Sequence, residues 1–265
     1  MPKWLRWATG AAILFLVACA LDGPLFPWSP VKPGYTHFVL HRADVYYPSG
    51  TALDPAYQQI DGYIEDAEAF HRLKMQDRIT VIAPRSWTDF HLQVPSERGP
   101  VAGITYATGM VIFITPKVVE KRADVGEYLR HELSHAILFQ NMTMWKAHQM
   151  NGQPWLLEGL AVDFGRQKSY LSQEEFAVAA RTRALGPSFA GDNSDMRFNY
   201  IAWRTFLEFL IQTRGRNKFQ DYLLRVMQDP RQARAVFPEY FAKPFDAAVA
   251  EFQASYTNGL TIATP

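Results

Sequence analysis

The sequence predicts an α+β fold, with a small mixed sheet and helices in the N-terminal half and a helical C-terminal half. In the first half, short runs rich in β-branched and aromatic residues indicate strands near 36–40 and 78–83 and a hairpin-like pair over 101–115, broken near Gly109. Residues 54–73 have helical periodicity. From residue 124 the pattern stays helical, with helices expected over 124–141, 154–164, 172–184, 196–213, 216–228 and 243–256. Strands followed by helices are typical of α+β proteins.

The start of the chain predicts export. Two positive charges, Lys3 and Arg6, precede a mostly apolar stretch over residues 8–20. This stretch is short for a bilayer-spanning helix, so it indicates a signal peptide over residues 1–18. An uncleaved membrane anchor is the alternative.

The apolar stretch ends in Leu16-Val17-Ala18-Cys19, which resembles the lipobox of bacterial lipoproteins, whose cysteine is acylated and becomes the mature N-terminus. Cys19 is the only cysteine in 265 residues, so no intramolecular disulfide can form. The resemblance implies a lipid on Cys19 that anchors an exported protein to the membrane of the bacterial cell envelope. Ala20 fits sorting to the outer membrane, facing the periplasm, if the source has two membranes.

Residues 19–35 are predicted to form the lipidated cysteine and a Pro/Gly-rich tether, and residues 36–265 a single domain. The tether is rich in proline and glycine and lacks helical or strand periodicity. About 230 residues remain, enough for one domain with a sizeable core. A formal charge of +1 argues against a basic surface that binds nucleic acid.

The most informative motif is His131-Glu132-Leu133-Ser134-His135, a HExxH sequence in the expected helix 124–141. Histidines four residues apart lie on one helix face, so both imidazoles can bind one metal ion. Glu132 lies about 100° around the helix, within reach of a water on that metal. The alternative is a helix whose histidines only form hydrogen bonds inside the protein, although burying them with a glutamate and no cation is costly.

A third ligand is expected from the segment Trp155-Leu156-Leu157-Glu158-Gly159-Leu160-Ala161, because catalytic zinc usually has three protein ligands and one open position. Pro154 suits the start of a helix. Glu158 lies in an otherwise apolar stretch, where a carboxylate is costly to bury without a cation.

With both motifs, the chain resembles the gluzincin metallopeptidases, and most closely the peptidase MA-like domains, in which HExxH is followed by Trp-Leu-x-Glu-Gly-x-Ala. The 22 residues between His135 and Glu158 make a longer spacing than in the thermolysin-like or aminopeptidase branches. The resemblance implies one zinc ion per chain, bound by His131, His135 and Glu158, with Glu132 as general base. It also implies a zincin-like fold whose metal cleft lies between a sheet-bearing half and a helical half.

Other residues are weaker candidates. Similar domains often carry a tyrosine near the start of a later helix, so Tyr200 is expected to stabilise the oxyanion, with simple packing as the alternative. Asp163 lies five residues after Glu158 instead of the four of thermolysin-like enzymes, which leaves open whether it orients a ligand histidine. The histidines outside the HExxH motif lack ligand spacing, although the loop of His148 joins the two ligand helices and could border the cleft.

These observations predict a membrane-tethered zinc peptidase that acts on a peptide or protein substrate. The strand pair at 101–115 either borders the cleft and pairs with an extended substrate or is an ordinary hairpin. Two other functions stay open: a metal-binding envelope interaction or assembly lipoprotein with little activity, and hydrolysis of cell-wall peptide cross-links. Cobalt or manganese could also occupy a His2Glu site.

Overall fold

A computed structural model describes residues 3–97, 99–170 and 196–257. Their strands are β1 (Tyr35–Val39), β2 (Ala43–Pro48), β3 (Ile79–Ile82), β4 (Gly103–Thr105) and β5 (Val111–Ile114). These form one sheet in the order β1-β2-β3-β5-β4. The inner strands β2, β3 and β5 are parallel, and the outer strands β1 and β4 pair antiparallel to their neighbours. The predicted small mixed sheet is confirmed, and β4 forms one of its edges.

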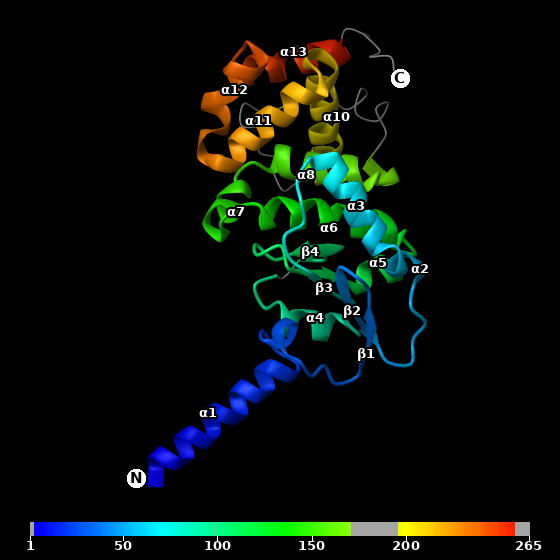
Figure 1. The fold of residues 1–265 in the computed structure, drawn as a ribbon, viewed down its shortest axis with the longest axis vertical. Helices are drawn as coiled ribbons and strands as arrows, with labels where there is room; N and C mark the ends of the chain where they lie inside the picture. The colour runs from blue at the N-terminus through cyan, green and yellow to red at the C-terminus, as the bar shows by residue number, and fades with distance from the viewer. Residues whose placement is uncertain (1–2, 98, 171–195, 258–265) are drawn as a thin grey trace.

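The described helices after the first strands confirm the α+β class, with most of them in the C-terminal half (Figure 1). They are α2 (Pro55–Gln58), α3 (Ile60–His71), α4 (Trp87–Gln93), α5 (Pro116–Glu120), α6 (Val125–Gln140), α7 (Met144–Met150), α8 (Pro154–Gly165), α10 (Met196–Arg214), α11 (Arg216–Gln228), α12 (Ala233–Phe241) and α13 (Phe245–Thr257). The helix expected over 172–184 lies outside the described residues.

Several elements differ from the expectation. The helix expected over 54–73 is divided into α2 and α3 at Gln59, whose backbone leaves the helical region at φ −93° and ψ 1°. Strand β2 and the helices α4, α5, α7 and α12 were not anticipated. Helices α4, α5 and α7 have five to seven residues, too few for a periodic pattern to stand out.

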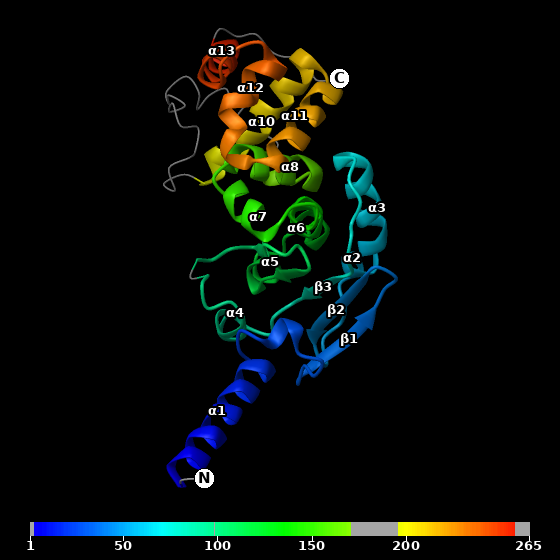
Figure 2. The ribbon, with the colours of Figure 1, turned by 60° about the vertical axis from the view of Figure 1, so that its left-hand side comes forward.

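Helix α6 lies between the sheet and the helical half (Figures 1 and 2). It begins at an N-cap, because the Asp124 side chain accepts a hydrogen bond from the Gly126 amide. Most of its residues are buried, since α3, α8 and β4 all pack against it. A side chain on α6 is therefore held rigidly between the two halves.

Helix α8 begins with Pro154 and packs closely on α10. An added Cβ at Gly159 would lie 3.0 Å from the Trp203 carbonyl oxygen, so glycine permits the two helices to approach. Around them, the aromatic side chains of Trp155, Phe206, Phe237 and Phe245 fill the core of the helical half. This packing fixes where Glu158 on α8 lies.

The N-terminal helix α1 (Lys3–Leu21) projects from the sheet-bearing end without a buried residue (Figures 1 and 2). Because the helix includes residues 3–7 as well as the apolar run, it is long and apolar enough to cross a membrane, a test that a signal sequence also passes. Either reading agrees with the expected export.

The segment after α1 packs on the domain earlier than expected. A short 3-10 helix, η1 (Phe26–Trp28), inserts Phe26 fully into a cluster with Ile82, Phe90 and Phe113. The buried Lys32 ammonium donates to the carbonyl oxygens of Pro27 and Ser29 in the same segment. The packed region thus begins at Phe26 instead of Thr36, because one aromatic side chain in a proline-rich segment anchors it.

Candidate metal centre

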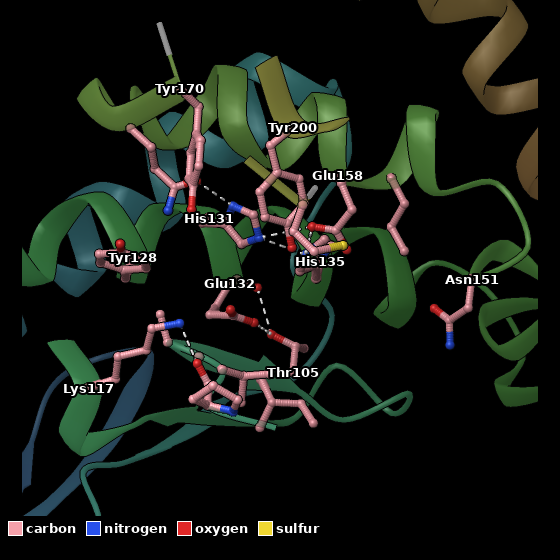
Figure 3. A pocket seen from close by; sticks show the side chains of 18 of the residues that line it. Thr105, Lys117, Tyr128, His131, Glu132, His135, Asn151, Glu158, Tyr170 and Tyr200 are labelled. Carbon is pink, nitrogen blue, oxygen red and sulfur yellow. Dashed lines mark hydrogen bonds and ion pairs between the residues drawn. The ribbon is translucent and has the colours of Figure 1, made fainter. Parts of the chain in front are cut away.

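The three residues expected as metal ligands meet between α6 and α8 (Figure 3). His131 and His135 are one turn apart on α6, and their Nε2 atoms are 3.1 Å from each other. Glu158 Oε2 lies 3.2 Å from His131 Nε2 and 3.6 Å from His135 Nε2. All three donor atoms fall within 4.8 Å of one another, so the group can hold a metal ion.

The charge and hydrogen bonding of this cluster suit a cation. Burial favours a neutral Glu158, but the two histidines outweigh it and hold the pKa of this carboxyl well below its usual range. His131 Nδ1 lies 2.9 Å from the side-chain oxygen of Gln167. When Nδ1–H donates a hydrogen bond to this oxygen, the neutral imidazole keeps a lone pair on Nε2. Two imidazole nitrogens and a carboxylate oxygen are donors that can bind a divalent metal ion.

Gln167 is a site residue that the sequence analysis missed. It directly follows the end of α8, where Arg166 takes a left-handed backbone conformation with φ 48° and turns the chain back toward α6. The Gln167 side chain is buried against His131. Its position next to a helix end carries no motif, so no pattern in the sequence indicates it.

Glu132 lies on the other side of the cluster, facing β4 (Figure 3). Its Oε2 accepts a 2.7 Å hydrogen bond from the Thr105 hydroxyl. Burial raises the pKa of Glu132 to about 7, although His131 and Thr105 lower it. An added Cβ at Gly103 would lie only 2.5 Å from Glu132 Oε1, so glycine on β4 provides the space for this carboxylate. Glu132 is thus close to the cluster without belonging to it.

Tyr200 reaches the same cleft from α10 (Figure 3). Its ring centroid is 6.3 Å from that of His131 and 5.1 Å from that of Tyr170. The Glu158 charge, followed by burial, raises the pKa of Tyr200 well above its usual range. The phenol therefore keeps its proton and remains a hydrogen-bond donor.

The cluster opens into a cavity of about 540 Å³. One wall includes residues of β4 and Lys117 of α5, and the other includes Leu157, Tyr170 and Tyr200. Asn151, after α7, also lines the cavity. His148 is exposed on α7, stacked on Trp145, and is not among the described lining residues. A cleft of this size can take part of a peptide or another small ligand.

The structure directs Asp163 away from the ligands. Its carboxylate oxygens lie 3.7 Å from Arg204 Nε and 3.9 Å from an Arg216 guanidinium nitrogen. The sequence left open whether Asp163 orients a ligand histidine. Among the described residues, Gln167 lies next to His131 instead. One residue beyond the usual spacing turns the side chain about 100° around α8, toward the helical half.

A scan of the chain against protein-family models finds no matching family, and a search of curated proteins finds no similar sequence. The function of the chain is therefore inferred from the geometry and chemistry of the site.

Proposed function

We propose that this chain is a zinc peptidase of the gluzincin, peptidase MA-like kind, with a zincin-like fold and one zinc ion held by His131, His135 and Glu158. The observation that carries the proposal is the convergence of these three donors on one side of a cavity, with Glu132 beside them. A purely structural zinc site would normally have a fourth protein ligand. An additional acidic side chain next to an open metal position suits hydrolysis.

Zinc in this site would polarise a peptide carbonyl and lower the pKa of a water molecule. Glu132 would accept a proton from that water as it adds to the carbonyl carbon, and would then donate the proton to the leaving nitrogen. The Thr105 hydroxyl would hold the carboxylate in position, and protonated Tyr200 would donate a hydrogen bond to the developing oxyanion.

The edge strand β4 is proposed to bind the substrate backbone. It pairs with β5 on one side, and its residues 103–105 line the cavity on the other. An extended peptide could add to this edge as another strand and bring a carbonyl toward the zinc. The substrate is accordingly a peptide or protein segment in extended conformation.

The chain is also proposed to act outside the cytoplasm, tethered to the envelope membrane through a lipid on Cys19. Helix α1, with Lys3 and Arg6 at its start and no buried residue, supports an N-terminal export signal or anchor. The lipobox-like residues 16–19 favour lipidation over an uncleaved helix.

The test combines metal content with one conservative variant. The full chain, purified in detergent, should contain about one zinc ion, and His131→Ala and Glu158→Ala should each lose it. Glu132→Gln should keep the zinc and lose peptide hydrolysis.

A metal-loaded, folded protein without activity on broad peptide mixtures would indicate the alternative function, a metal-binding envelope lipoprotein that acts by interaction. A wild-type protein that binds no offered zinc would overturn the metal centre itself. Hydrolysis by Glu132→Gln at the wild-type rate would show that another group is the base.

A further inference from the structure

The connection between α1 and the domain is short and folded. Helix α1 ends at Leu21, and Phe26 is already buried in the domain core. Five residue steps span at most about 18 Å even when fully extended. Here they are more compact, because the amides of Gly23 and Leu25 both donate to the Cys19 carbonyl oxygen, at 3.1 and 3.0 Å. The domain therefore cannot move far from whatever holds residues 3–21.

Side-chain contacts also join this connection to the domain. Asp22 forms a 3.0 Å ion pair with Arg85, which in turn pairs with Asp89 at the start of α4. Both ribbon views place α4 beside the end of α1 (Figures 1 and 2). The end of α1 is thus attached to one defined face of the domain.

Three large apolar side chains next to this attachment point are exposed. Leu25 is 43% exposed, Trp28 55% and Val31 57%. They alternate with the buried anchors Phe26 and Lys32, so the backbone that carries them is fixed. The Trp28 ring packs on Tyr106 at 5.5 Å between centroids, which orients it. We call Leu25, Trp28 and Val31 the neck patch.

We propose that the neck patch is a membrane-docking surface, which inserts into the headgroup region of the bilayer that holds α1 or the lipid on Cys19. The chain itself brings the patch to the bilayer, because Leu25 follows α1 by four residues. Tryptophan and aliphatic side chains gain free energy at the boundary between headgroups and acyl chains. If α1 is kept, Lys3 and Arg6 at its start hold that end on the cytoplasmic side, and if the chain is cleaved and lipidated, Cys19 begins the exported protein. Both forms leave the patch on the outer surface.

This inference rests on the proposed membrane attachment and not on the peptidase chemistry. Docking would hold the catalytic cleft at one height above the bilayer instead of on a flexible tether. Substrates would then be peptide segments close to the membrane surface, such as the parts of envelope proteins next to their own anchors.

The experiment uses the full chain in phosphatidylcholine vesicles that contain a lipid with a nitroxide on its headgroup. A fluorophore is attached to Trp28→Cys or Val31→Cys, and the matched control is Trp145→Cys on α7, where the wild-type side chain is 68% exposed. The wild-type chain, with Cys19 as its only cysteine, provides the background. Zinc content and circular dichroism show that each variant is folded.

After subtraction of the wild-type Cys19 signal, the proposal predicts that nitroxide lipid quenches the fluorophore at positions 28 and 31, while position 145 gives the same signal with and without the nitroxide. Equal signals at all three positions would overturn it. A chain that fails to float with vesicles would overturn both the attachment and the docking, and would leave the zinc site to be judged by its own test.

Discussion

Gly103 lies where strand β4 passes closest to the Glu132 carboxylate, so Gly103→Ala tests whether catalysis needs this carboxylate in its present position. The added methyl would lie 2.5 Å from Oε1 and 2.8 Å from Cγ of Glu132, whereas ordinary contacts begin near 3.4 Å. Glu132 is only 3% exposed and accepts a 2.7 Å hydrogen bond from Thr105, so a shift of the carboxylate would disturb this bond. Either the carboxylate or the strand must move by about 1 Å.

A displacement of this size at a reacting group lowers catalysis by about 10²-fold, equivalent to about 2.7 kcal/mol in transition-state stabilisation. The metal should remain, because Glu132 is not among the three converging donors. The assay is kcat/KM on a peptide that the wild-type chain cleaves, together with zinc content by mass spectrometry and the thermal unfolding midpoint.

The matched control is Gly62→Ala on α3, where an added Cβ meets nothing within 4 Å. It should keep full activity and be about 0.5–1 kcal/mol more stable, since alanine favours helix over glycine. Wild-type kcat/KM in zinc-loaded Gly103→Ala would refute the reasoning about Glu132. Loss of zinc in that variant would refute it too, because the effect would then act through the ligands.

Three further variants test other parts of the structure. Gln167→Leu removes the acceptor for His131 Nδ1 and should weaken zinc binding about 10- to 100-fold in competition with a chelator; unchanged affinity would show that Gln167 does not orient the ligand. Tyr200→Phe should keep the zinc and lower kcat about 10²- to 10³-fold, and an unchanged kcat would assign Tyr200 to packing alone. Glu68→Gln should cost about 2 kcal/mol of unfolding free energy in urea at neutral pH, because Arg42 at 2.6 Å and other donors bind the buried carboxylate. The hydrogen bond from Arg42 is the largest of the effects that lower the pKa of Glu68 from 4.5 to about 2. The folded state thus binds this proton less readily than the unfolded state. The difference in unfolding free energy between the wild type and Glu68→Gln should therefore be full above pH 4.5 and vanish as the pH falls to 2. A difference that persists at pH 2 would contradict this account.

Elements with strong local signals agree with the sequence analysis. The expected helices 124–141 and 154–164 correspond to α6 and α8, because caps, proline starts and apolar periodicity act within a few residues. Strand β2 and the division between α2 and α3 were missed. Strand pairing depends on partners far along the chain, which local patterns do not reveal. A single non-helical residue is too short a break to disturb the apolar periodicity.

The tether shows the same limit. Its proline and glycine content indicated a tether outside the compact domain, yet Phe26 is buried against residues of β3, β5 and α4 that are more than 50 positions away. Composition reflects only the local conformational preferences of a segment. Whether the segment packs on the domain depends on the burial of one large side chain among distant residues.

The sequence by itself determined the candidate ligands, since a spacing of four on a helix places His131 and His135 on one face and the isolated Glu158 needs a cation. Only the tertiary structure decided what surrounds them. Gln167 next to His131, Gly103 and Thr105 next to Glu132, and Arg204 and Arg216 next to Asp163 are neighbours across separate elements. Their partners are set by how α6, α8, α10 and β4 pack together, because the distances between elements are fixed by the shared core and not by residue spacing along one helix.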